Sequence, residues 1–206
     1  MTESKIAQNE FTNVEKNLKA RGYAVRTFAT GQEAADYLDA ALDGRTVGLG
    51  GSATLDALGI YERLETHNRV IWHWRQEPAS ARREAMEAEV YLTSVNALGE
   101  TGELVNIDGV GNRVAATLFG HKKVYFVIGR NKLTPGYDEA VWRARNIAAP
   151  QRARQLKAKT PCALKGGDRC YDCRSPERVC RGLVTLWGPM MGMEAEVLLV
   201  DEDLGL

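Results

Sequence analysis

Residues 46–54 read TVGLGGSAT, a short apolar stretch that runs into two adjacent glycines and then into hydroxyl residues. The pattern predicts a strand over Thr46–Leu49, a bend at Gly50 and Gly51, and a helix that begins near Thr54. Glycine has no side chain, so the backbone of such a bend can approach a ligand, and the start of the helix offers free N–H groups to an anion. The bend indicates a ligand site, with a plain tight turn capped by Ser52 as the alternative.

Apolar, β-branched runs alternate with helically spaced segments on both sides of this bend. Such alternation predicts an α/β fold with a mostly parallel sheet covered by helices on both faces. The chain shows no internal repeat or low-complexity linker, so we expect a single domain over residues 1–206. The expected strands lie at residues 23–28, 46–49, 70–74, 90–95, 103–107, 123–128, 183–187 and 196–200, and the main expected helices at 11–20, 32–42, 54–64, 79–88, 112–119 and 137–149.

The composition is that of an ordinary globular protein, with 44% hydrophobic and 26% charged residues. Its 27 Lys and Arg residues balance its 27 Asp and Glu residues, so the overall charge does not favour nucleic acid as a partner. The polar start MTESKIAQNEF lacks the apolar core of a signal peptide, and no apolar run is long enough to cross a bilayer. We therefore expect a cytoplasmic protein without a membrane span.

A second glycine bend lies at residues 108–113, DGVGNR. It again places glycines before a helical segment, and Arg113 adds a fork-shaped cation that suits a carboxylate or a phosphate. The segment is neither a Walker loop nor a dinucleotide fingerprint, because it lacks the Lys-Ser/Thr pair and the third glycine. A surface ion pair with an acidic residue is the alternative role for Arg113.

One carboxylate stands out between the two bends. The stretch TSVNALGETG, residues 93–102, begins as a buried strand and ends in small polar residues around Glu100. A carboxylate at the end of a strand can act as a nucleophile or a general base, which makes Glu100 a candidate catalytic residue. It can equally hold a turn together by accepting backbone hydrogen bonds.

Four longer runs carry a resemblance to a known family: GGSATL (50–55), TSVNALGETGELVNIDGVGNR (93–113), FGHKKVYFVIGRNKL (119–133) and RARNIAAPQRARQLKAKTPC (143–162). Together they resemble the lactate-utilisation (LUD) family, whose members include an accessory component of bacterial lactate oxidation. The resemblance covers most of the chain from about Val47 onward. It implies a fold similar to those of CoA transferases, ribose-5-phosphate isomerases and glucosamine-6-phosphate deaminases.

The resemblance also implies that both bends face one cleft. Glu100 would correspond to the acyl-carrying glutamate of CoA transferases, although the surrounding ETG departs from their motif. To the residues that the resemblance implies we add Asn96 after the strand, the two glycines of the second bend, and Lys132 at a strand end, where a solvated loop lysine is the alternative. The expected ligand-binding residues are Gly50, Gly51, Ser52, Thr54, Asn96, Asn106, Asp108, Gly109, Gly111, Asn112, Arg113 and Lys132.

Other charged residues suggest no specific chemistry from the sequence. We expect Arg143, Arg145, Arg152 and Arg154 to form a mostly solvated helical face. His73 lies within an apolar strand and has no second histidine at a metal-ligand spacing, so we expect an ordinary structural role for it.

The four cysteines of the chain share one loop, at about residues 160–181, in the pattern C-x7-C-x2-C-x6-C. In a reducing compartment such a group favours metal binding over disulfides, and the C-x2-C pair can direct two thiolates at one ion. Zinc and an iron–sulfur cluster both accept four thiolates, and the redox association of the resembled family favours the cluster. Free thiols are the alternative. The expected ligands are Cys162, Cys170, Cys173 and Cys180.

These observations lead to three hypotheses about function. The first is an accessory component of organic-acid oxidation that binds a small anion, namely a hydroxy acid, an acyl-CoA or a phosphate, and works with iron–sulfur partner subunits of a lactate-oxidation system. The second is a free-standing acyl-CoA transferase or sugar-phosphate isomerase that uses Glu100. The third is a binding module whose metal loop is purely structural. A homodimer is compatible with each of them.

Overall fold

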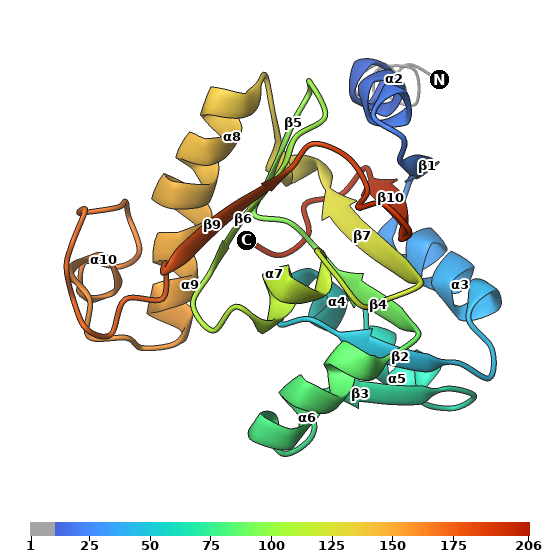
Figure 1. The fold of residues 1–206 in the computed structure, drawn as a ribbon. Coiled ribbons are helices and arrows are strands. Elements are labelled where there is room, and N and C mark those ends of the chain that lie inside the picture. The colour runs from blue at the N-terminus through green and yellow to red at the C-terminus, as the bar shows by residue number, and fades with distance from the viewer. Residues whose placement is uncertain (1–10) are drawn as a thin grey trace.

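The computed structural model describes residues 11–206, and Figure 1 shows their arrangement. Its centre is a six-stranded sheet in which every neighbouring pair of strands is parallel. The α/β fold class expected from the sequence is confirmed. Across the sheet the order is β1 (Ala24–Phe28), β10 (Glu194–Val200), β7 (Lys123–Gly129), β4 (Val90–Thr93), β2 (Thr46–Leu49) and β3 (Arg69–Trp72).

Helices cover both faces of this sheet. Successive residues of a strand point to opposite sides, so a continuous apolar strand presents apolar side chains to helices on each face. In β7, Phe126 belongs to the hydrophobic cluster that includes residues of α2 and α6, whereas Val127 belongs to the cluster that includes residues of α3, α4 and α5. The helices are α2 (Thr12–Ala20), α3 (Gly31–Ala41), α4 (Ala53–Ala57), α5 (Ile60–Leu64), α6 (Pro78–Glu84) and α7 (Asn112–Ala116), and α6 continues into a 3-10 turn at Ala85–Glu87.

The helix expected over residues 54–64 is interrupted. Gly59 has a φ of 61°, the left-handed conformation that glycine adopts readily, and it separates α4 from α5. As a result α4 is a single short turn that follows the glycine bend. Within residues 11–206, no helix has both the length and the apolar character that a membrane crossing requires.

Two expected strands, at residues 103–107 and 183–187, belong to a second, smaller sheet and not to the parallel one. In this sheet β6 is antiparallel to both of its neighbours, which makes the complete architecture less uniformly parallel than the sequence pattern alone indicates. The order is β8 (Leu133–Thr134), β5 (Ala97–Gly99), β6 (Leu104–Asp108) and β9 (Gly182–Leu186).

A long helical segment packs on the second sheet, where Ala140 and Ala144 contact Ala97 and Val105 in a small apolar cluster. The segment consists of α8 (Tyr137–Arg143), a π-helical turn (Ala144–Ala148) and α9 (Ala149–Gln155). Beyond α9 the chain forms α10 (Pro161–Leu164) and the cysteine loop, which Figure 1 shows on the outer side of α9, away from the parallel sheet. The loop then leads directly into β9.

Candidate anion site

A pocket of about 570 Å³ lies where the two glycine bends meet. The parallel strands β2, β4 and β7 are neighbours, so their carboxyl ends share one edge of the sheet, which is where open α/β sheets bind ligands. Nine of the twelve residues expected to bind a ligand line this pocket: Gly51, Ser52, Thr54, Asn96, Asp108, Gly109, Asn112, Arg113 and Lys132.

The first bend is held in place by close contacts around its glycines. A Cβ atom at Gly50 would lie 3.0 Å from Cγ of Arg113 and from Oγ1 of Thr93, so this position packs against the second bend behind the pocket wall. The Ser52 hydroxyl caps α4 by accepting a hydrogen bond from the N–H of Leu55. The capping role considered from the sequence is therefore present, on a residue that also lines the pocket.

Arg113 lines the pocket, but its guanidinium is fully occupied by the protein. Its terminal nitrogens donate to four oxygens, the backbone carbonyls of Ser94 and Ile107 and the side-chain amides of Asn96 and Asn106, and its Nε lies 3.3 Å from Oδ2 of Asp108. All five of its N–H groups therefore have partners. These contacts connect the second bend with the segment that follows β4, and Arg113 contributes positive charge, while burial lowers its pKa below the usual arginine value.

Lys132 lies in the 3-10 turn (Arg130–Lys132) that follows β7, and only 3% of its surface is exposed. The solvated alternative for this residue is thus wrong. Its Nζ atom donates to Oγ1 of Thr54 at 2.8 Å and to Oγ of Ser94 at 2.9 Å. Burial, and then the charges of Arg143 and Arg113, lower the pKa of Lys132 to about 7, because each disfavours the ammonium form.

Four further arginines line the pocket: Arg82, Arg152, Arg178 and Arg181. The sequence did not single them out as ligand-binding residues. In the described part of the chain, none of the four forms an ion pair with a carboxylate. The Nε–H group of Arg82 is buried without a hydrogen-bond partner. The pocket wall is therefore strongly cationic.

The outer part of this wall also contains aromatic rings. The guanidinium of Arg152 lies over the Trp74 ring, 4.8 Å from its centroid. His73 lines the pocket beside it, and burial together with the charges of Arg82 and Arg152 lowers the pKa of His73, so the neutral imidazole is favoured. A Cβ atom at Gly51 would lie 3.3 Å from both the His73 and Trp74 rings, so the first bend packs tightly against them.

The expectation of a solvated arginine face on the helical segment is wrong for two of its four members. Arg143 is buried and donates to the carbonyls of Asn131 and Asn96, and Arg152 lines the pocket. Arg145 and Arg154 are exposed as expected. Helical spacing alone could not reveal this, because the second sheet and the bends pack on one side of the helix and leave the other to solvent.

Four expected site residues do not line the pocket: Gly50, which packs behind its wall, and Asn106, Gly111 and Glu100. Asn106 lies behind it as a partner of Arg113, and the N–H of Gly111 donates to Oδ1 of Asp108 at the start of α7. Glu100 lies in the turn between β5 and β6, where its N–H donates to the Thr134 carbonyl and its own carbonyl accepts from Asn17. The structure thus does not bring Glu100 to the pocket.

The cysteine loop contains four free cysteines, each half-buried. The N–H of Asp172 donates to Sγ of Cys170 at 3.3 Å, and Arg178 donates to Sγ of Cys180 at 3.4 Å; both contacts stabilise negative charge on sulfur. Within residues 11–206, no three His, Cys, Asp or Glu side chains are arranged as a ready-made metal site. The donor set suits zinc or an iron–sulfur cluster in number and kind, while convergence of the four sulfurs requires a rearrangement of the loop.

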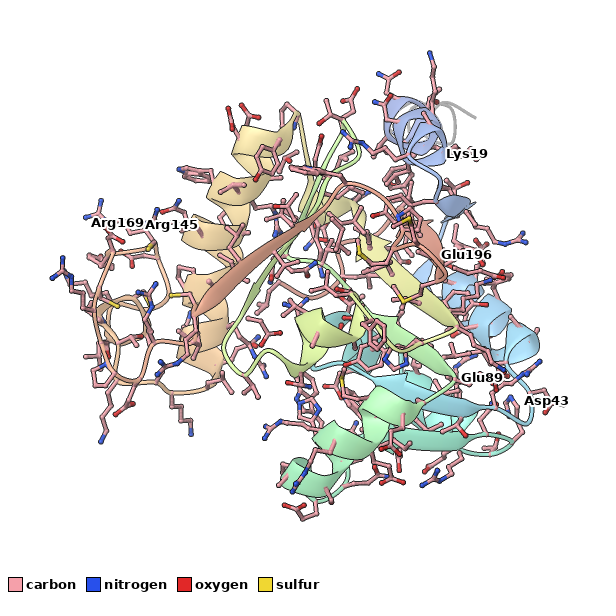
Figure 2. All side chains as sticks on the ribbon, viewed as in Figure 1. Lys19, Asp43, Glu89, Arg145, Arg169 and Glu196 are labelled. Carbon is pink, nitrogen blue, oxygen red and sulfur yellow. The ribbon has the colours of Figure 1, made fainter. Side chains whose placement is uncertain are left out.

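The cysteine loop and the pocket share a wall. Arg178, Val179 and Arg181 belong to the loop and also line the pocket. The N–H of Arg181 donates to the carbonyl of Asp108 at 2.9 Å, and a Cβ atom at Gly109 would lie only 2.7 Å from the Val179 carbonyl. Figure 2 labels Arg169 on the same loop and Arg145 next to it, and Arg145 forms an ion pair with Asp172 of the loop.

The fold is similar to that of a solved protein of the same class. A crystal structure of a DUF162 family protein from Deinococcus radiodurans superposes with a TM-score of 0.58, at 16% sequence identity, over 94% of this chain and 98% of that one. The family model of the LUD domain matches residues 11–200, so the chain belongs to the LUD-domain family. A search of curated proteins gives no significant match.

Proposed function

We propose that the protein is an accessory component of organic-acid oxidation of the lactate type, in which the pocket binds a small organic anion. The observation that carries this proposal is the set of four pocket-lining guanidiniums, Arg82, Arg152, Arg178 and Arg181, without a carboxylate partner in the described chain. Keeping like charges together in a partly buried wall is unfavourable unless a bound anion offsets them. Membership of the LUD-domain family supports the general metabolic role.

The size and chemistry of the pocket are consistent with a carboxylate or phosphate ligand. Its volume of about 570 Å³ falls within the usual range for small-molecule sites. Among the described residues, the only side-chain carboxylate that lines it, Asp108, is already paired with Arg113. A hydroxy acid fits the proposed role most simply, and an acyl-CoA or a phosphate has the same anionic character. Because Glu100 lies outside this pocket, we do not propose a Glu100-dependent transferase or isomerase.

We further propose that Cys162, Cys170, Cys173 and Cys180 hold a metal ion or an iron–sulfur cluster. An iron–sulfur cluster would supply one-electron transfer, and zinc would supply a structural cross-link. The Asp172 N–H and the Arg178 guanidinium already donate to the sulfurs of Cys170 and Cys180, and hydrogen bonds to sulfur are common at such metal centres. Arg178 and Arg181 would then transmit the binding or loss of the metal in the loop to the pocket wall.

Isothermal titration calorimetry with lactate, pyruvate and phosphate tests the anion site. Arg82→Ala is expected to weaken binding about 10-fold or more, because a partly desolvated charge-assisted hydrogen bond contributes roughly 1.5–3 kcal/mol. Arg83→Ala is the matched control, since Arg83 is exposed on the same helix. Wild-type protein that binds none of the three anions, or equal affinities for the two variants, would contradict the proposal.

Anaerobic purification tests the metal proposal. We expect visible charge-transfer absorbance together with iron and sulfide if a cluster is bound, or stoichiometric zinc without colour, and loss of either on Cys170→Ser substitution. Co-purification with iron–sulfur and flavin-containing subunits would support the accessory role. Four titratable thiols and no metal in anaerobic protein would remove this part of the proposal.

A further inference from the structure

The amine of Lys132 lies in the pocket without any acidic partner. Within residues 11–206, it forms no ion pair, and its hydrogen bonds go to the hydroxyls of Thr54 and Ser94, which also line the pocket. The charged groups that act on it are the guanidiniums of Arg113 on α7 and Arg143 on α8. Most buried lysines are stabilised by a carboxylate, and this one faces only hydroxyls and positive charge.

The hydrogen bonds at this site match a neutral amine. The Thr54 hydroxyl can donate its own proton to the Leu204 carbonyl, 3.2 Å away, so its oxygen is free to accept from Lys132. A neutral amine has two N–H groups, one for Thr54 and one for Ser94, and keeps its lone pair. An ammonium would have a third N–H group, for which the described residues show no acceptor. The lowered pKa agrees with this geometry.

We infer that Lys132 is a nucleophile that forms a reversible imine with a 2-oxo acid bound in the pocket. The inference rests on the proposed anion site and names the substrate class for it. The Nζ lone pair attacks the C2 carbonyl carbon to give a carbinolamine, and a proton passes from nitrogen to the former carbonyl oxygen. The second proton of the nitrogen then passes to this hydroxyl group, which leaves as water while the C=N bond forms, so no oxidant or reductant is required.

The charge around Lys132 favours a 2-oxo acid over a simple aldehyde or ketone. In a 2-oxo acid the carboxylate is bonded directly to the reacting carbon, so it must lie close to Nζ when the imine forms. The positive charges of Arg113 and Arg143 stabilise an anion at that position, and the same charges disfavour protonation of the amine. A substrate without an anionic group next to its carbonyl would gain neither effect.

Reductive trapping of the wild-type protein tests the inference. The protein is incubated with pyruvate and sodium cyanoborohydride at neutral pH, digested, and mapped by mass spectrometry. We expect one carboxyethyl group on Lys132, at a level on the order of 100-fold above that on Lys122, because only a neutral amine attacks a carbonyl carbon and free lysine is almost entirely protonated at neutral pH. Lys122 is exposed and pairs with Glu89, so it reports background labelling.

Lactate carries a hydroxyl group in place of the ketone at C2, so it distinguishes anion binding from imine formation. It should compete with pyruvate and lower the labelling of Lys132 without forming an adduct. If calorimetry shows that pyruvate binds while Lys132 stays unlabelled, or labels no more than Lys122, the imine is refuted and the anion site stands. If neither pyruvate nor lactate binds and Lys132 is not labelled, both the inference and the proposed function fail. Lys132→Arg, which keeps a cation, should abolish the adduct.

Discussion

The Nζ atom of Lys132 lies 2.8 Å from Oγ1 of Thr54, although 78 positions separate the two residues in the chain. Thr54 lies in the first turn of α4, which follows β2, and Lys132 follows β7, with β4 between these two strands in the sheet. Because all three strands run parallel, the segments after them emerge at one edge. The contact therefore depends on the order of the strands in the sheet.

The buried amine predicts a particular dependence of stability on pH. Lys132 has a pKa of about 7 in the folded protein, against the ordinary value of 10.5. Between these two pH values the unfolded chain binds a proton at this position that the folded chain lacks, so the free energy of unfolding should rise with pH. Its neighbours Arg113 and Arg143 stay charged over this range, and the hydroxyls of Thr54 and Ser94 do not titrate.

The measurement compares urea unfolding of the wild type and of Lys132→Met across this pH window. Relative to the variant, the wild type should gain up to about 1.4 kcal/mol per pH unit. Every other titratable group is common to both proteins, so the difference isolates Lys132. Parallel stability curves would show that Lys132 keeps an ordinary pKa in the folded state.

Removing one unpaired pocket cation should stabilise the unliganded protein. The Nε–H group of Arg82 is buried without a partner, which is unfavourable for folding. Arg82→Met keeps a similar apolar length and should raise the free energy of unfolding by about 1 kcal/mol in anion-free buffer, while it weakens anion binding. Arg83→Met should change stability by less than about 0.5 kcal/mol. Equal destabilisation by both substitutions would refute this role of Arg82.

The shared wall of loop and pocket makes Gly109 a sensitive position. A Cβ atom there would lie 2.7 Å from the Val179 carbonyl, so Gly109→Ala must displace the segment that carries Arg178 and Arg181. We expect a loss of roughly 1–3 kcal/mol in stability and weaker anion binding. At Gly182, in β9, a Cβ atom meets nothing within 4 Å, and Gly182→Ala should leave both properties almost unchanged. If Gly109→Ala kept full anion affinity, the position of the loop would have no influence on anion binding.

Metal removal provides an independent test of whether the cysteine loop influences the anion pocket. If the four cysteines hold a metal, chelation should loosen the segment around Cys170 to Cys180 and increase its hydrogen exchange. Anion affinity should fall with it, because Arg178 and Arg181 belong to this segment and line the pocket. The exchange of β7, in the centre of the parallel sheet, serves as the internal control. Unchanged exchange in the loop after chelation would contradict the connection.

Much of the parallel sheet could be predicted from local pattern. Strands such as Lys123–Gly129 are continuous apolar runs, and Gly50 and Gly51 end a strand where a Cβ atom would lie only 3.0 to 3.3 Å from its neighbours. Most of the pocket residues in the two bends were found for the same reason, since each lies directly after a strand. The smaller sheet was not anticipated, because the pairing partners of β6 and β9 are distant in the chain and periodicity carries no information on pairing.

The cationic wall could not be predicted in this way. Arg82, Arg152 and Arg181 come from α6, α9 and the cysteine loop, and each resembles a solvated arginine in its local context. Only the packing of these three segments around the bends brings them together. Conversely, Arg113 looked like a ligand-binding fork, and its neighbours in the fold use all of its donors.

The central claim is that the pocket between the glycine bends binds an organic anion. The most direct measurement is a crystal structure of the wild-type protein grown with saturating pyruvate. We expect density for the ligand in this pocket, with its carboxylate in contact with pocket-lining cations and its C2 carbon within bonding reach of Lys132. A pocket that contains only solvent under these conditions, with pyruvate absent or bound elsewhere, would contradict it.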